Sequence, residues 1–191
     1  MHEALAALER GGVVVVPTDT VYGLATRADN PKGIERIYEL KGRPDDKPFQ
    51  VLVAGVDALE DFAEVTAVAS KLAAAFWPGP LTIVLPAGRS APEGVVREGL
   101  IGLRAPNHPL ALELVAASGP LAATSANLSG EPTPTTVDAL LDLFGPRVDA
   151  YVDGGAIETR ASTVVKVDDG KIEILRAGPI TAEALKGAIG A

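Results

Sequence analysis

Short apolar runs alternate with segments of helical spacing along the whole chain. The run VVVVP (13–17) is continuous and β-branched, which is typical of a strand buried on both faces. Further apolar runs predict strands at 49–55, 81–87, 101–106 and 121–124. Helical spacing and end signals predict helices over 3–10, 66–77, 109–118, 136–144 and 181–188, and one that begins at Pro31 after an Asn30 cap. A hairpin is predicted over 162–176, with Asp169-Gly170 for its tight turn. The pattern indicates a mixed α/β protein.

The polar stretch TDTVYGLATRADN (18–30) follows the most apolar run, and we predict that it is a loop. Open α/β sheets usually bind ligands in loops at the carboxyl ends of strands. A turn in which Thr and Asp side chains bond to their own backbone explains the same residues. The sequence leaves both interpretations open.

Composition narrows the class of protein. The chain has 191 residues, of which 47% are hydrophobic and 22% charged, as in ordinary globular domains. With no fixed-period repeat and no long linker, we expect one domain over residues 1–191. Its tail, from about residue 177, is expected to be either a lid or a packing helix. The absence of cysteine excludes disulfides, thiolate zinc sites and a Cys nucleophile, and two histidines are too few for a multi-His metal site.

The net charge of −8 argues against a broad, sequence-independent grip on nucleic acid, so we expect little direct binding of double-stranded nucleic acid. Any anionic ligand must be met by locally concentrated cations. Lys41, Arg43 and Lys47 lie together in the loop KGRPDDKP (41–48) and suit phosphate, although a solvated surface is the simpler explanation. The N-terminus lacks a signal-peptide pattern, and no apolar stretch approaches the ~20 residues that span a bilayer. We expect a cytoplasmic protein without a membrane segment.

Arg104 ends an otherwise apolar predicted strand, where a long cation needs an anion or solvent nearby. A buried structural ion pair is one explanation, and binding of a small carboxylate is the other. His108 follows closely, between Asn107 and Pro109. It is predicted to be a loop histidine with backbone partners, in preference to a general base.

The stretch PLAATSANLSGEPTPTT (120–136) turns a buried strand into a run of small polar groups. Ser125 could act as a nucleophile with Lys41 or His108 as its base, but the Gly-x-Ser-x-Gly elbow is missing. Alternatively, small residues let a flat ligand approach the backbone, and Ser125 and Asn127 orient it by hydrogen bonds. Neither of the two familiar glycine-rich phosphate loops occurs in the chain. The residues alone therefore predict a small-anion pocket at strand ends, without a reaction.

Six segments in one order resemble the threonylcarbamoyl-AMP synthase family, often called the YrdC or Sua5 family. They are VPTDTVYGL, ELKGRPDDKP, WPGPLTIVL, LRAPNHPL, ATSANLSGEPTPT and STVV…ILRAG, and they span nearly the whole chain. The chain resembles the short, single-domain form. The resemblance implies a twisted, open mixed sheet flanked by helices, with a concave basic pocket at strand ends.

The resemblance also implies a reaction. Family members condense L-threonine, bicarbonate and ATP, with Mg²⁺, to threonylcarbamoyl-AMP and pyrophosphate. A tRNA threonylcarbamoyl transferase machinery then passes the group to adenosine 37 of tRNA. By resemblance, the catalytic residues are Lys41, Arg43, Ser125 and Asn127. ATP is expected to contact Arg43, Lys47, Ser125, Ala126 and Arg176, and L-threonine to contact Thr20, Arg104, Thr124 and Ser162. The resemblance assigns the metal no protein side chain.

Two other functions stay open at this point. One is a carbamoyl-adenylate-forming enzyme, although that domain normally belongs to a much longer, cysteine-containing chain. The other is a non-catalytic RNA-binding module, which the net charge of −8 disfavours.

Overall fold

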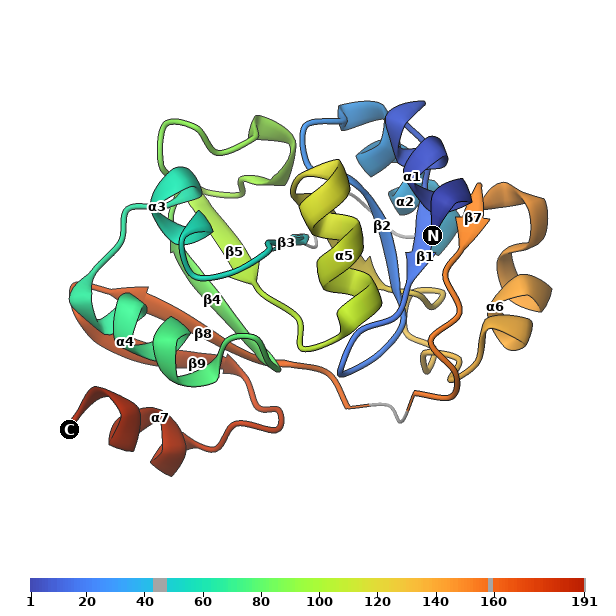
Figure 1. Ribbon diagram of the computed structural model, residues 1–191. Coiled ribbons are helices and arrows are strands. Elements are labelled where there is room, and N and C mark those ends of the chain that lie inside the picture. Colours follow the sequence, from blue (N-terminus) through green and yellow to red (C-terminus); the bar gives the residue numbers. More distant parts are fainter. Residues whose placement is uncertain (43–47, 158–159, 191) are drawn as a thin grey trace.

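The protein is built around one mixed sheet of nine strands (Figure 1). The computed structural model describes residues 1–42, 48–157 and 160–190. The strands are ordered β7-β1-β2-β6-β3-β5-β4-β8-β9 across the sheet. Their bounds are β1 Val14–Val16, β2 Gly23–Arg27, β3 Gln50–Leu52, β4 Leu81–Pro86, β5 Leu100–Arg104, β6 Leu121–Ser125, β7 Ala150–Tyr151, β8 Thr163–Asp168 and β9 Lys171–Arg176. Parallel pairs join β1 to β7, β3 to β5 and β4 to β8, and the other neighbours are antiparallel.

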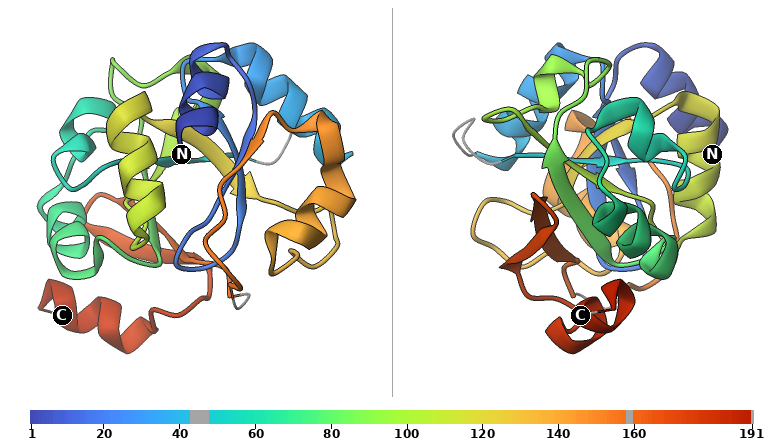
Figure 2. Two further views of the ribbon diagram at one scale, coloured as in Figure 1. Left: turned by 45° about the vertical axis from the view of Figure 1, so that its right-hand side comes forward. Right: turned by 90° about the vertical axis from the view of Figure 1, so that its left-hand side faces the viewer.

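Helices cover both faces of this sheet (Figures 1 and 2). They are α1 His2–Glu9, α2 Pro31–Lys41, α3 Ala58–Phe62, α4 Ala67–Phe76, α5 Pro109–Ser118, α6 Val137–Phe144 and α7 Ala182–Ile189, with two short 3₁₀ turns at Glu93–Val95 and Gly145–Arg147. Alternate residues of β1 belong to different apolar clusters. Val14 belongs to the apolar cluster that includes residues of α1 and α5, whereas Val15 belongs to the cluster that includes residues of α2, α4 and α6. The predicted burial of this strand on both faces is confirmed.

The prediction that residues 18–30 form a loop is wrong for part of that stretch. Gly23–Arg27 is the strand β2, which pairs with β1 on one side and β6 on the other. Its residues Leu24, Ala25 and Thr26 are all completely buried. The small and polar residues of this segment do not show the sequence pattern of a strand. The segment becomes a buried strand because it pairs with β1 and β6.

The ends of α2 follow their sequence signals closely. Pro31 occupies the first turn after Asn30, and Gly42 ends the helix in the left-handed region, at φ 60°. Such a conformation favours glycine, because it has no Cβ. The Asn30 side chain donates to the carbonyl of Gly11 at 2.9 Å instead of capping the helix. This ending brings Lys41 to the buried side of the helix terminus.

The C-terminal tail packs beside α4, and the views of Figures 1 and 2 agree on this. Leu185 of α7 is buried, and the Ile180 backbone exchanges two hydrogen bonds with the Thr163 hydroxyl, at 3.0 and 2.9 Å. Within the described part of the tail, no residue beyond Arg176 lines the pocket described below. In this structure the described tail thus contacts α4 and the first residue of β8. The helices that the structure describes are all too short or too polar to cross a bilayer.

Candidate active site

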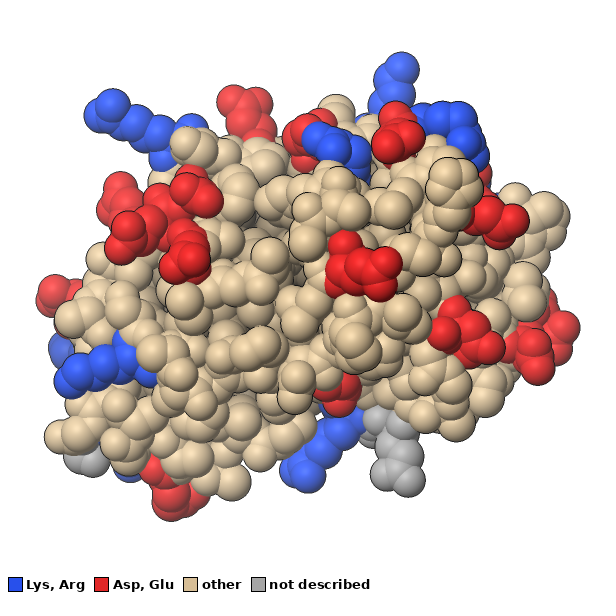
Figure 3. Space-filling view, viewed as in Figure 1, with Lys and Arg blue, Asp and Glu red and all other residues tan. Residues whose placement is uncertain are grey.

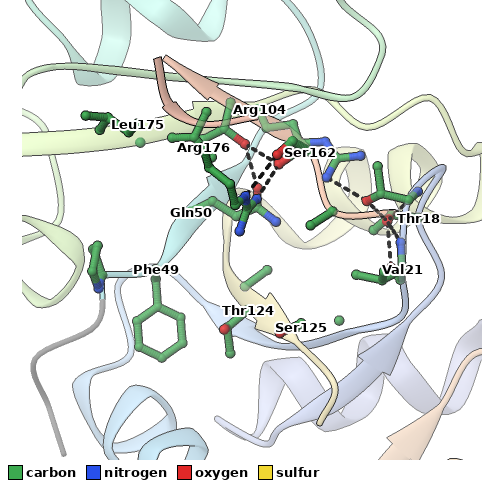
Figure 4. A pocket seen from close by; sticks show the side chains of 18 of the residues that line it. Thr18, Val21, Phe49, Gln50, Arg104, Thr124, Ser125, Ser162, Leu175 and Arg176 are labelled. Carbon is green, nitrogen blue, oxygen red and sulfur yellow. Dashed lines mark hydrogen bonds between the residues drawn. The ribbon is translucent and has the colours of Figure 1, made fainter. Parts of the chain in front are cut away.

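A pocket of about 860 Å³ opens on the sheet beside the carboxyl end of β1 (Figure 4). Its floor is made by β3, β5, β4 and β8. Gln50 pairs with Gly102, and Gly102 pairs with Val84, so their side chains share one face of the sheet. The volume falls in the range of small-molecule sites, roughly 300–1,000 Å³. The pocket therefore includes strand ends, as expected, but also extends across the faces of the central strands.

Arg104 lies at the buried end of this pocket and is only 1% exposed. Its guanidinium donates to the Asp19 carboxylate at 2.6 Å, to the Thr20 hydroxyl at 2.9 Å and to the Gly79 carbonyl at 3.1 Å. Burial lowers the pKa of Arg104, the Asp19 charge opposes this effect, and the charge of Arg176 adds to it. The buried ion pair considered from the sequence is thus present. Arg104 also lines the pocket, and these three contacts leave two of its five N–H donors unused.

The loop between β1 and β2 is both a turn and a wall of the site. The Thr18 hydroxyl accepts from the backbone N–H of Val21 at 3.2 Å and donates to the Val21 carbonyl at 2.6 Å. Asp19 and Thr20 instead face Arg104. The turn interpretation is therefore confirmed for Thr18, and Thr20 lines the pocket, whereas ligand binding by this loop stays a prediction.

A chain of four polar side chains crosses the pocket floor (Figure 4). The Arg176 guanidinium donates to the Ser162 hydroxyl at 2.9 Å, and the Ser162 and Thr82 hydroxyls lie 3.0 Å apart. Thr82 donates to the Gln50 side-chain oxygen at 2.9 Å. Burial lowers the pKa of Arg176. One hydrogen-bonded row thus links the strands β3, β4 and β9 through Ser162, the residue directly before β8.

The third part of the site is built by Lys41, which is 2% exposed. Its ammonium group donates to the carbonyl of Ser125, to the carbonyl of Asn127 at 2.8 Å and to the Asn127 side-chain oxygen at 3.1 Å. The Asn127 amide nitrogen in turn donates to the carbonyls of Leu128 and Glu131, at 2.8 and 2.6 Å. Lys41 therefore fixes the turn that follows β6 from behind the pocket.

These contacts do not form a Ser/Lys nucleophile pair. The Ser125 hydroxyl donates to the side-chain oxygen of Asn127, and the Lys41 ammonium meets the Ser125 carbonyl instead of its hydroxyl. The expectation that His108 has backbone partners is wrong for Nδ1, which is buried and has no hydrogen-bond partner among the described residues. Gly154 lies beside the other ring nitrogen, because a Cβ at this position would come within 3.1 Å of His108 Nε2. Burial lowers the pKa of His108, and the Asp19 charge opposes this.

Most of the predicted site residues come together in the pocket. The lining includes Thr20, Arg104, Thr124, Ser125, Asn127, Ser162 and Arg176. Lys41 and Ala126 are buried behind the lining. Arg43 and Lys47 lie outside the described residues. Sequence reasoning missed Gln50, Thr82 and Arg97, which also line the pocket. A polar residue inside an apolar run was the available signal for the first two.

The described residues offer no ready-made metal site: none of their His, Cys, Asp and Glu side chains form a group of three or more that could hold an ion. Two carboxylate side chains, Glu98 and Glu131, are present in the described lining. On the face in Figure 3, Asp and Glu side chains lie among the Lys and Arg residues.

Comparison with known proteins gives consistent matches over nearly the whole chain. Residues 6–178 match the Sua5/YciO/YrdC family, which is described as "Telomere recombination". The threonylcarbamoyl-AMP synthase of Bacillus subtilis is 42% identical over 98% of this chain and 56% of its own length. The putative threonylcarbamoyl-AMP synthase of Methanocaldococcus jannaschii is 37% identical over 92% of this chain and 84% of its own length. The crystal structure of Pyrococcus abyssi Sua5 complexed with L-threonine superposes with a TM-score of 0.92 and 37% identity, covering 98% of this chain and 56% of that one. The chain thus spans little more than half the length of the Bacillus and Pyrococcus proteins.

Proposed function

This chain belongs to the Sua5/YciO/YrdC family, and on that premise we propose that it condenses L-threonine, bicarbonate and ATP to threonylcarbamoyl-AMP and pyrophosphate. The observation that carries the proposal is the pocket itself. The buried Arg104, the more exposed Arg176, a row of hydroxyl and amide groups and the Ser125–Asn127 turn all converge on one cavity. Relatives that carry this activity in their names match almost the whole chain.

The chemistry suits a site built from hydrogen-bond donors and cations. The threonine amine attacks the carbon of bicarbonate, and water leaves to give the carbamate. A carbamate oxygen then attacks the α-phosphorus of ATP, and pyrophosphate leaves. Each reactant carries a negatively charged group, so positioning and electrostatic stabilisation provide the rate increase without a covalent nucleophile.

We assign the amino acid to the Arg104 end of the pocket. The unused N–H donors of Arg104 suit its carboxylate, with Thr20, Thr124 and Ser162 as further contacts. The P. abyssi structure with L-threonine supports an amino-acid site in this fold. Arg104 already forms an ion pair with Asp19, so the substrate carboxylate would bind to a guanidinium group that one carboxylate already contacts.

We assign ATP to the side of the pocket lined by Ser125 and Asn127, with Ala126 buried between them and Arg176 near the nucleotide. The ammonium group of Lys41 lies directly behind that turn and adds positive charge there. Arg43 and Lys47 would contribute phosphate contacts from the loop outside the described residues. The described residues provide no acidic cluster for Mg²⁺, so we propose that the ion arrives on the triphosphate.

Arg43→Ala is expected to lower kcat/KM for ATP by about 100-fold, or ~3 kcal/mol, with the fold unchanged. Steady-state kinetics and a circular dichroism spectrum of the variant check both halves of this expectation. Near-normal turnover would remove Arg43 from the site.

The test of the proposed function is pyrophosphate release from ATP by the purified protein, with L-threonine and bicarbonate each present or omitted. Release that requires both substrates supports the synthase. Release that requires carbamoyl phosphate instead would favour a carbamoyl-adenylate-forming enzyme, and salt-sensitive binding of RNA without turnover would favour an RNA-binding module. The product is proposed to pass to a tRNA threonylcarbamoyl transferase in the cytoplasm.

A further inference from the structure

The hydrogen-bonded row on the pocket floor has a fixed direction. A guanidinium group only donates, so the Ser162 hydroxyl accepts from Arg176 at 2.9 Å. The Thr82 hydroxyl donates its one proton to the Gln50 side-chain oxygen at 2.9 Å. Ser162 must therefore donate its own proton to Thr82, across 3.0 Å. Each hydroxyl has one proton, so the charge of Arg176 sets the orientation of every group along the row.

The end of this row is the Gln50 carboxamide. Its oxygen accepts from Thr82, which leaves the nitrogen, with two N–H donors, as the other terminal atom. Gln50 is half-buried and lines the pocket, and within the described residues its nitrogen donates to no recorded acceptor. The row thus holds a donor in a fixed orientation at the pocket surface.

The neighbours of Gln50 leave room for a ligand above it. Gln50 pairs with Gly102 on one side and with Ala123 on the other, and both are small pocket-lining residues. Arg104 follows two residues after Gly102 on the same face of β5. Two residues along a strand span about 6.6–6.8 Å, a distance that a small amino acid bridges.

We propose that the Gln50 amide nitrogen donates to the side-chain hydroxyl of the amino-acid substrate and makes the site selective for a hydroxylated amino acid. This inference rests on the proposed function, with the substrate carboxylate at Arg104. L-Valine has the shape of L-threonine but carries a methyl group in place of the hydroxyl. Its binding would leave the oriented donor unpaired, and sites built to bond a substrate hydroxyl reject analogues that lack it.

The experiment measures kcat/KM for L-threonine and for L-valine in the wild type, Gln50→Leu and Gln50→Glu. The leucine variant removes the donor. The glutamate variant keeps an oxygen for Thr82 but replaces the donor by an acceptor. The leucine variant is expected to reduce the threonine-to-valine ratio by about 10- to 100-fold, whereas the glutamate variant is expected to keep part of this ratio, because the threonine hydroxyl can also donate to a carboxylate oxygen. Leu175→Ala is the matched control, because Leu175 lines the same pocket but is 51% exposed and apolar. Its ratio is expected to equal that of the wild type.

A wild-type measurement covers the case in which the variants fail to fold. L-allo-Threonine carries the hydroxyl with inverted configuration, so its kcat/KM is expected to be about 10-fold lower than that of L-threonine. Equal values for the two substrates would overturn the inference.

The other outcomes are equally decisive. An unchanged ratio in the folded Gln50→Leu variant overturns the inference, and if its KM for bicarbonate is raised at the same time, the donor is assigned to bicarbonate instead. A wild type that makes no adenylate from L-threonine would instead refute the proposed function itself.

Discussion

The ion pair between Asp19 and Arg104 gives the sharpest stability prediction. The two side chains are only 14% and 1% exposed, and their N–O distance is 2.6 Å. Asp19→Ala leaves the Arg104 charge buried, while burial and the nearby charge of Arg176 continue to act against it. Removing one partner of a buried pair costs about 3–5 kcal/mol. For a chain of this size the melting temperature should fall by roughly 6–20 °C.

Urea denaturation of the wild type, of Asp19→Ala and of the double variant Asp19→Leu/Arg104→Met measures the free energy of unfolding that depends on the ion pair. The double variant removes both charges and retains apolar volume, so we expect its free energy of unfolding to lie within about 1–2 kcal/mol of the wild type. The reasoning fails if Asp19→Ala alone costs less than about 1 kcal/mol, the value of a solvent-exposed pair.

Three further substitutions test other parts of the structure. Lys41→Met removes the ammonium group that holds the Ser125–Asn127 turn, and steady-state assays should show kcat/KM for ATP lowered by about 100-fold; full activity would contradict the role given to this lysine. Tyr22→Phe deletes a hydroxyl that donates to the Gly155 carbonyl at 2.7 Å, and urea denaturation should show a loss of about 1–3 kcal/mol. Burial lowers the pKa of His108 below its ordinary 6.5, so the unfolded chain binds a proton first and stability falls as pH drops from about 6.5. Between pH 7 and pH 5 the melting temperature of His108→Leu should fall less steeply than that of the wild type. An equally steep fall in both proteins would contradict the role given to His108.

Much of the fold could be predicted from local signals. The helix that begins at Pro31 and the helix Pro109–Ser118 carry their own end signals, and both occur as expected. The hairpin turn at Asp169 and Gly170 has φ 47° and 74°, which the Asp-Gly pair accommodates. Such features depend on neighbouring residues alone.

The missed features depend on long-range pairing. The strand Gly23–Arg27 forms because β1 pairs with one of its edges and β6 with the other, and no local sequence pattern predicts it. The row from Gln50 to Arg176 exists because the order β3-β5-β4-β8-β9 brings distant segments together. Arg104 was predicted as a site residue, but its partner Asp19 is 85 residues away in the chain. A sequence shows which polar residues are unusual, and the topology decides which of them meet.

The most direct test of the central claim is the mass of the reaction product. The protein is incubated with ATP, L-threonine and ¹³C-labelled bicarbonate, and the nucleotides are separated and weighed by mass spectrometry. The account predicts an adenylate that contains one threonine and one labelled carbon, in step with the pyrophosphate released. AMP or ADP alone, or an adenylate without the labelled carbon, would contradict it.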